Sequence, residues 1–337
     1  MYAYLEFSWY FLLMLMAFFF TIKRKVIVSS NLFLFFYLFL SLVTSVIIRT
    51  AGFDWDIQVY ANAMHSKTIS TYYLKEPIVW FGMRYLYTIV NSEILVFVIY
   101  DVTFYFLFFC SIRQLKYPQY SYFLVFLFFP FFLGAQNVYR QFAAEIFLIA
   151  SIAYSFEKKI KSSILAWVFL LFSFLSHNAV MLFLSAFFIT KKKFRYKFLS
   201  LVYLLLALFA TSYLADIKSA DSQSALSLEL VYAALSVIIP ILYVAVFKFK
   251  FKNDEFSLNF FVILLMNTFI VLNANLFLSS TQSERVGMFS FSICLIALIY
   301  LIEKKMRHKP VLRFLLVVFS SLPVFVFSSS RSFLFGS

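Results

Sequence analysis

Long apolar runs, separated by short basic clusters, constrain this chain more than any other feature of its sequence. Apolar residues make up 64% of the 337 residues, against about 45–50% in soluble globular domains. Charged residues make up 13%, where an average soluble protein has about 25%. Apolar runs of roughly 20 residues predict helices that cross a lipid bilayer. We therefore expect an all-α polytopic integral membrane protein, with 1–337 forming a single transmembrane domain.

The apolar runs predict about twelve membrane spans, several of them shorter than the roughly 20 residues that a helix needs to cross the hydrocarbon core. They lie near 7–22, 31–48, 93–112, 121–133, 141–156, 163–176, 178–190, 198–214, 230–247, 257–276, 286–302 and 311–327. Tilting, burial within a bundle, or a turn that lines a water-filled cavity would accommodate the short ones. The shortest pair turns at His177.

The basic clusters predict the orientation of the chain. Most of the 29 Lys and Arg fall in one set of short connections, such as those at 23–25 and 191–193. The positive-inside rule places these connections in the cytoplasm and both termini outside. The outer side then carries the longer loops: an extracytoplasmic loop with an interfacial helix at about 49–92, and a second loop at about 215–229. This asymmetry favours a large substrate on the outer face over a cytoplasmic nucleotide-sugar.

Cysteine, histidine and glycine are too few or too scattered for the usual cofactor sites. Cys110 and Cys294 both lie in predicted spans, where we expect buried free thiols rather than a disulfide. The three His have no metal-ligand spacing, and five Gly leave no Gly-rich phosphate loop. We therefore expect no metal and no cofactor. The net charge of +14 comes from lysines between spans, which indicates topology and no nucleic-acid partner.

The first outer loop begins with two carboxylates around an aromatic ring. Asp54 and Asp56 flank Trp55 just beyond the end of the second predicted span. Such carboxylates could bind sugar hydroxyls, hold a divalent cation or act as a general base. The alternative is a solvated loop in which Trp55 anchors the chain at the membrane interface.

The same loop ends in a predicted interfacial helix. Lys75-Glu76-Pro77 indicates a helix start, because proline suits the first helical turn. The segment 78–90 that follows is too short to span a membrane, so we expect it at the outer interface. Arg84 within it either faces a phosphate or extends its side chain to lipid headgroups.

Polar groups also mark later spans. Asp101 lies within a predicted span, where a carboxylate is costly; it is either a functional group, as in a proton-coupled transporter, or a partner of a neighbouring polar residue. Arg140 lies at the start of a predicted helix, where backbone N–H groups favour anions. An arginine at that position suits a diphosphate. Glu145, five residues later, either orients an arginine or faces a cavity. His177 suits proton transfer near neutral pH, although a lone histidine near an apolar face is more often structural. Arg285 repeats the position of Arg140, so the two either converge on one anion or each reach toward headgroups.

These residues occur in an order that resembles a known family. The order is D-W-D-x-x-x-Y, then E-P before a short helix, N-x-Y-R-Q-x-x-A, S-H-N-A-V and finally E-R-V-x-x-F. Over about residues 50–290 the chain resembles the EpsG family of exopolysaccharide proteins and, more widely, the Wzy-type polysaccharide polymerases. R-Q-x-x-A followed by H-N is the most specific part of this pattern.

The resemblance implies a metal-independent glycosyltransferase of GT-C-like architecture in the bacterial inner membrane, with its active site facing outward. It would join oligosaccharide repeat units carried on undecaprenyl diphosphate into O-antigen, capsule or exopolysaccharide. The implied partners are the lipid-linked donor and acceptor, the bilayer, and a chain-length regulator and flippase of the same pathway. A flippase or exporter of the same lipid-linked sugars, an acyltransferase and a small-solute transporter that uses Asp101 remain alternatives.

The resemblance also divides the candidate site residues into three sets. The residues expected to accept a proton from the attacking hydroxyl are His177, Asp54, Asp56 and Glu76. The residues expected to bind the diphosphate are Arg140, Arg285, Arg84 and Arg49. The residues expected to contact sugar rings are Trp55, Tyr60, Tyr139 and Gln141.

Overall fold

In the part of the chain that it describes, the computed structural model of the protein consists of helices joined by short connections. The described residues are 2–22, 31–53, 55–66, 71–157, 159–190, 194–215, 228–248, 255–327, 330–331 and 334. The chain divides into two compact units. Unit 1 contains Met1–Ala150, Leu171–Asn178 and His308–Ser337, and unit 2 contains Ser151–Leu170 and Ala179–Arg307.

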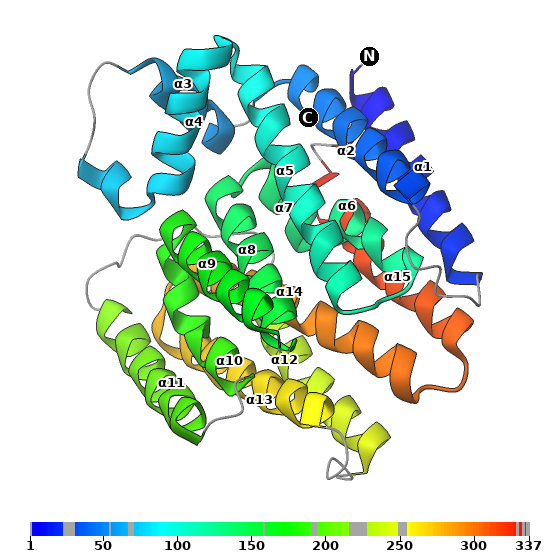
Figure 1. The fold of residues 1–337 in the computed structure, drawn as a ribbon, viewed down its shortest axis with the longest axis vertical. Helices are drawn as coiled ribbons and strands as arrows, with labels where there is room; N and C mark the ends of the chain where they lie inside the picture. Colours follow the sequence, from blue (N-terminus) through cyan, green and yellow to red (C-terminus); the bar gives the residue numbers. More distant parts are fainter. Residues whose placement is uncertain are drawn as a thin grey trace. The chain divides into compact units, whose positions relative to one another are not determined.

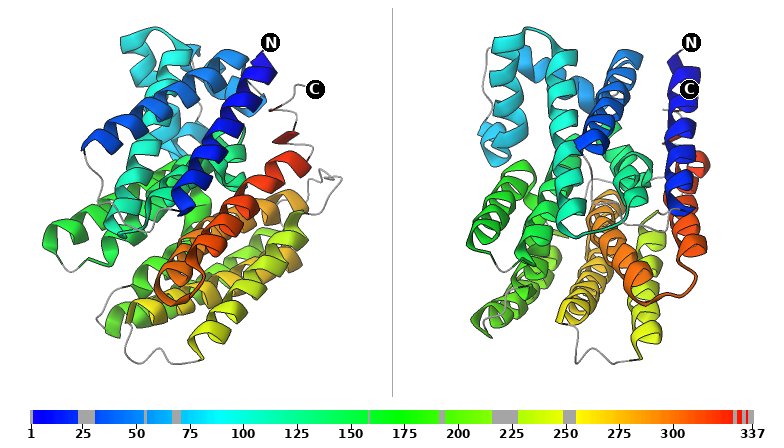
Figure 2. Two further views of the ribbon diagram at one scale, coloured as in Figure 1. Left: turned by 90° about the vertical axis from the view of Figure 1, so that its right-hand side faces the viewer. Right: turned by 45° about the vertical axis from the view of Figure 1, so that its right-hand side comes forward.

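Unit 1 combines both ends of the sequence. Its elements are α1 (Tyr2–Ile22), α2 (Asn31–Ala51), α3 (Trp55–His65), η1 (Thr71–Lys75), α4 (Pro77–Val90), α5 (Glu93–Gln114), η2 (Gln119–Phe123), α6 (Leu124–Leu127), α7 (Phe129–Gln136), most of α8 (Tyr139–Ser155) and α15 (Lys309–Val326). Helices α1 and α15 pack side by side, although they are distant in sequence (Figure 2). Helix α2 packs along α5, while α4 contacts both α3 and α5 (Figure 1).

Unit 2 is built around α14. Its elements are most of α9 (Ile160–Ser176), η3 (Asn178–Phe183), α10 (Leu184–Ile189), α11 (Phe194–Ala215), α12 (Leu228–Phe247), α13 (Glu255–Phe277) and α14 (Ser280–Lys305). Helix α14 packs against both α12 and α13, and α13 also contacts α10 and α11. Among the candidate membrane spans, α14 has the most deeply buried apolar stretch.

Seven of the described helices are long and apolar enough to cross a membrane: α1, α2, α5, α12, α13, α14 and α15. An eighth results if Gln119–Leu127 and Phe129–Gln136 count as one span, bent by 48°. The bend follows from Pro130, which has no N–H to continue the preceding helix. The chain is thus a multi-pass membrane protein, but the expected twelve spans are not confirmed. Helices α8 and α9 have only 17 residues each.

The helix boundaries follow the apolar pattern of the sequence closely. The run predicted at 93–112 is α5, which begins where the Ser92 side chain accepts a hydrogen bond from the Leu95 N–H. The hairpin predicted around His177 is present, with α9 on one side and η3 on the other. Cys110 and Cys294 are free thiols; Cys294 is buried, as expected, whereas Cys110 is only partly buried.

Close packing of α12 on α14 depends on Gly287. A Cβ atom added at Gly287 would lie 2.6 Å from the Cβ of Tyr232 on α12. Small residues allow helices to approach closely in membranes. We expect Gly287→Ala to lower the free energy of unfolding by about 1–3 kcal/mol, measured by reversible unfolding in mixed micelles. Leu242→Ala, on an exposed part of α12, is the control, and equal stability of the two variants would contradict this packing.

Candidate functional site

The site begins with a carboxylate at the start of α4. Glu76 occupies the N-cap position of α4 directly before Pro77, as the sequence predicted. An N-cap side chain commonly accepts a hydrogen bond from the first helical turn, but the Glu76 side chain makes no such bond. Glu76 is buried, and its carboxylate contacts residues from two later segments instead. The start of α4 thus places the Glu76 carboxylate where it can contact residues of other helices.

Glu76 connects an arginine and a histidine. Its Oε2 atom accepts a hydrogen bond from Nη1 of Arg140, the second residue of α8, in an ion pair. Its Oε1 atom lies 3.5 Å from Nδ1 of His177 and accepts a 3.3 Å hydrogen bond from the backbone N–H of Asn178. We call Glu76, Arg140 and His177 the Glu76 cluster. The sequence placed these three residues at the outer ends of different segments, and the structure brings them together.

Aromatic rings hold the guanidinium of Arg140 in place. Its Nε donates a 2.9 Å hydrogen bond to the Tyr60 hydroxyl. Its Cζ lies 5.8 Å from the centroid of the Tyr60 ring and 5.2 Å from that of Trp80. Tyr73 stacks on Trp80 at a centroid distance of 4.5 Å. A cation held against aromatic faces gains electrostatic attraction, so Arg140 has a defined orientation before any ligand arrives.

The Glu76 cluster is shielded from solvent but not closed. The side chains of Arg140 and His177 are 17% and 15% exposed, and that of Glu76 is 6% exposed. Charges in such partly buried positions interact more strongly than in water, because the local dielectric constant is lower. The cluster can therefore offer both a cation and a proton acceptor to a ligand that reaches its exposed edge.

Tyr60 contributes a hydroxyl that stays protonated. Burial raises the pKa of the Tyr60 phenol, and the opposing effect of the Arg140 guanidinium does not cancel the increase. The negative charges of Asp56 and Glu76 raise this pKa further. At neutral pH the buried Tyr60 hydroxyl therefore keeps its proton while its oxygen accepts a hydrogen bond from Arg140.

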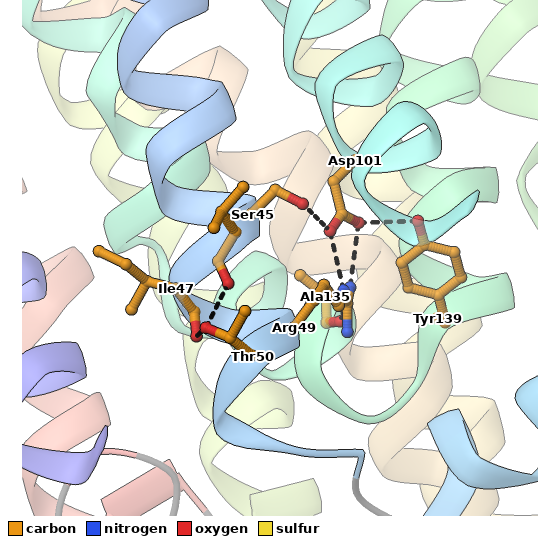
Figure 3. A network of polar contacts seen from close by, with 8 residues as sticks. Ser45, Ile47, Arg49, Thr50, Asp101, Ala135 and Tyr139 are labelled. Carbon is orange, nitrogen blue, oxygen red and sulfur yellow. Dashed lines mark hydrogen bonds and ion pairs between the residues drawn. The ribbon is translucent and has the colours of Figure 1, made fainter. Parts of the chain in front are cut away.

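A second polar network in unit 1 surrounds Asp101 (Figure 3). Arg49 donates to Asp101 through two nitrogens, Nε to Oδ2 at 2.9 Å and Nη2 to Oδ1 at 3.0 Å. The hydroxyls of Ser45 and Tyr139 donate to the same carboxylate at 2.6 Å and 2.7 Å. These four bonds use all the lone-pair sites of a carboxylate. Asp101 is 0% and Arg49 2% exposed, so this is a satisfied ion pair inside the protein.

Burial corrects three of the expected ligand contacts. Arg49 was expected to bind a diphosphate, but its guanidinium is buried against Asp101. Tyr139 and Gln141 were expected to contact sugars, but both are fully buried. Tyr139 donates to Asp101, and Gln141 donates a 2.8 Å hydrogen bond to Glu145. These residues therefore hold helices together rather than face a substrate.

The other expected site residues have different placements. Asp54 and the side chain of Trp55 lie outside the described residues. Asp56 on α3 and Arg84 on α4 are partly exposed, and their ligand roles stay predictions. Arg285 lies on α14 in unit 2, so its convergence with Arg140 also stays a prediction. Among the described residues, no group of three or more His, Cys, Asp or Glu is arranged to hold a metal ion.

Sequence reasoning missed Trp80. It lies against the guanidinium of Arg140 and packs on the Tyr60 ring at a centroid distance of 4.7 Å. The available signal was its spacing from Glu76, because residues four apart share one face of a helix. That spacing places an aromatic ring beside the carboxylate that pairs with Arg140.

Comparison with known proteins adds one finding. The model of the EpsG family matches residues 30–335, which is nearly the whole chain and includes the Glu76 cluster. Neither a curated protein nor a solved structure matches the chain.

Proposed function

The chain belongs to the EpsG family, a Wzy-type polymerase-like family, and on that premise we propose that it joins lipid-linked oligosaccharide units into a polysaccharide. Membership itself assigns a polysaccharide polymerase-like role and a place in polysaccharide biosynthesis. The observation that carries the finer proposal is the Glu76 cluster, in which a cation, a carboxylate and an imidazole from three segments are in contact. The proposed donor and acceptor are oligosaccharides on undecaprenyl diphosphate.

Arg140 is the proposed binding group for the donor diphosphate. It stands in the first turn of α8, where helix N–H groups favour anions. Its guanidinium is held by Tyr60 and Glu76 yet keeps an exposed edge. An arginine fork matches phosphate oxygens in two places. A preorganised cation stabilises negative charge as it develops on the departing diphosphate.

His177 is the proposed general base, and Glu76 is its partner. The carboxylate lies 3.5 Å from Nδ1 of the imidazole, so in this proposal Nε2 is the nitrogen that takes the proton. When Nε2 takes that proton the ring becomes a cation, and the adjacent Glu76 charge stabilises it. Histidine suits this step because small environmental changes move its charge across the neutral pH range.

The proposed reaction balances without a metal or a cofactor. The hydroxyl oxygen at the non-reducing end of the acceptor forms a bond to the anomeric carbon of the growing chain. The bond between that carbon and the diphosphate oxygen breaks, and its electron pair leaves with undecaprenyl diphosphate. The hydroxyl proton passes to His177. Tyr60 can donate to an oxygen of the sugar or phosphate, because its phenol stays protonated.

The charge pattern supports a site on the outer face of the membrane, which by family membership is proposed to be a bacterial inner membrane. The three segments that supply the Glu76 cluster were each predicted to be outside from the distribution of Lys and Arg. Their mutual contacts agree with one side for all three. By the same proposal, a flippase delivers the lipid-linked units and a chain-length regulator acts on the product.

The contacts of Asp101 weaken the transporter alternative. A proton-coupled transporter needs a carboxylate that gains and loses a proton during its cycle. Asp101 is instead bonded to Arg49, Ser45 and Tyr139 and is fully buried. The carboxylate therefore joins α2, α5 and α8 as a structural ion pair, which is a different use of the residue from carrying a proton.

A product gel tests the proposal. Lipid-linked and surface glycans are compared from cells with the intact gene, without it, and with Arg140→Ala or Arg113→Ala. Arg113 is an exposed arginine at the end of α5 and serves as the matched control. We expect a ladder from the intact gene and from Arg113→Ala. The deletion and Arg140→Ala are expected to give a single repeat unit exposed at the outer face.

Two other results would contradict the proposal. Repeat units that accumulate on the cytoplasmic face of the deletion strain would show that the protein moves them across the membrane. An unchanged ladder in the deletion strain would show that it neither moves nor joins them.

A further inference from the structure

The connection between α7 and α8 is fastened at both ends to one buried ion pair. Before the connection, the backbone carbonyl of Ala135 accepts a 2.8 Å hydrogen bond from Nη2 of Arg49. After it, the hydroxyl of Tyr139 donates to Oδ1 of Asp101 at 2.7 Å. Figure 3 shows both attachments beside the bonds that join Arg49 to Asp101. The chain between these two points therefore has little freedom to shift.

Packing fixes the same connection. The Tyr139 ring is fully buried and lies edge-on to the ring of Phe97, with a centroid distance of 5.5 Å. Gly134 allows the end of α7 to approach α8, because an added Cβ would lie 2.9 Å from the Cβ of Phe142. The Arg49 guanidinium itself lies over the rings of Phe97 and Tyr139, at 5.0 Å and 5.2 Å.

Arg140 follows Tyr139 directly, so the orientation of one determines that of the other. Successive residues of an α-helix point about 100° apart around its axis. With Tyr139 held inward by Asp101, Arg140 is directed toward Glu76 and Tyr60, where its guanidinium is found. A rotation of the first turn of α8 would move the guanidinium away from both partners.

We propose that Arg49, Asp101 and Tyr139 are positioning residues, which lock the α7–α8 connection and thereby hold the Arg140 guanidinium in its working orientation. The catalytic consequence rests on the proposed function, whereas the mechanical link does not. Arg49, Asp101 and Tyr139 touch no substrate in this scheme, since all three are buried. They act through the backbone that carries Arg140.

Chemical labelling of Arg140 measures the mechanical link without reference to activity. The full-length protein in nanodiscs is treated with phenylglyoxal, and the modification rate of each arginine is read by mass spectrometry. Tyr139→Phe removes one hydrogen bond to Asp101. Arg49→Lys keeps the positive charge but cannot reproduce the two-nitrogen contact together with the bond to Ala135. We expect Arg140 to be labelled about three- to tenfold faster in both variants.

Tyr37→Phe is the matched control. Tyr37 is also fully buried, and its hydroxyl donates a 3.1 Å hydrogen bond to the Tyr105 carbonyl, which joins α2 to α5 and not to the α7–α8 connection. We expect Arg140 labelling to stay at the parent rate in this variant, and the labelling of exposed Arg113 to be equal in all variants. An Arg140 rate that is unchanged in Tyr139→Phe and Arg49→Lys, or raised equally in Tyr37→Phe, would overturn the proposal.

Elongation kinetics of the same preparations separate this proposal from the proposed function. If the parent elongates lipid-linked repeat units, we expect Tyr139→Phe to lower kcat by about the same factor as it raises Arg140 labelling. Faster labelling of Arg140, in a protein whose parent form elongates nothing, would confirm the positioning role and contradict the polymerase. An unchanged kcat together with faster labelling would show that the orientation of Arg140 does not serve the reaction.

Discussion

Replacing Asp101 with asparagine is expected to lower the free energy of unfolding by about 3–5 kcal/mol. The reason is the charge that is left behind. Arg49 is 2% exposed and directs two nitrogens at the Asp101 carboxylate. An amide in place of that carboxylate removes the only negative charge among the residues drawn in Figure 3. The arginine then remains buried as a cation whose charge is no longer balanced.

Two controls identify the mechanism of this loss. The double variant Arg49→Met with Asp101→Leu removes both charges, so we expect it to lose much less stability than Asp101→Asn alone. Glu157→Gln alters an ion pair with Lys159, whose side chain is 78% exposed, and is expected to cost less than about 1 kcal/mol. Reversible unfolding in mixed micelles measures all three variants.

The activity of Asp101→Asn then separates two roles of the residue. If Asp101 holds the ion pair, the double variant restores stability that the single variant loses. If Asp101 carries a proton through a transport cycle, Asp101→Asn keeps parental stability and loses only transport. Parental stability of Asp101→Asn would therefore contradict the structural role that its four hydrogen bonds indicate.

Helix positions were predictable from sequence, because apolar run length reports directly on membrane burial. The runs at 31–48 and 93–112 became α2 and α5 with ends shifted by a few residues. The number of crossings was less predictable. A run such as 121–133 is apolar throughout, but Pro130 interrupts its hydrogen bonding and bends it by 48°. Apolar composition measures burial, and it does not say whether a short helix crosses the membrane.

The Glu76 cluster was partly predictable for a related reason. A charged group at the start of an apolar span is costly, so Arg140 stood out from its surroundings, whereas Glu76 was noticed as the carboxylate directly before Pro77 at an expected helix start. The direction of a side chain was not predictable. Tyr139 and Arg140 are neighbours in one polar stretch, yet Tyr139 is fully buried while Arg140 keeps an exposed edge. That difference depends on the rotation of α8, which the contact between Tyr139 and Asp101 fixes across 38 residues of sequence.

Trp80 was missed because aromatic residues carry little information in this chain. The sequence contains 50 Phe, 22 Tyr and 4 Trp, and most of them pack as apolar bulk. Trp80 is of functional interest because it contacts the Arg140 guanidinium. A contact between residues that lie in separate helices requires the tertiary fold.

Replacing Glu76 with glutamine is expected to lower kcat for elongation by about 10²–10⁴-fold. The substitution keeps the size of the side chain and its place before Pro77, so α4 can still form. It removes the negative charge shared between Arg140 and His177. The imidazolium that forms in the reaction then loses its stabilising partner, and the ion pair that holds Arg140 becomes a neutral contact.

The exposed pair of His65 and Glu93 provides a matched control in the same unit. Glu93→Gln makes the same chemical change beside another histidine, whose side chain is 48% exposed. We expect this variant to keep the parental kcat, because solvent screens the charge and the pair is separate from the Glu76 cluster. The measurement is the elongation rate of a purified lipid-linked repeat unit by each variant in nanodiscs.

The division between kcat and KM decides what Glu76 does. A carboxylate that stabilises the imidazolium acts mainly in the transition state, so its loss lowers kcat while KM changes little. If the carboxylate only held Arg140 for donor binding, its loss would raise KM and leave kcat nearly unchanged. A tenfold or greater loss in Glu93→Gln as well would show that both substitutions act through the fold of unit 1. That result would remove the evidence for Glu76 as the partner of His177 in proton transfer.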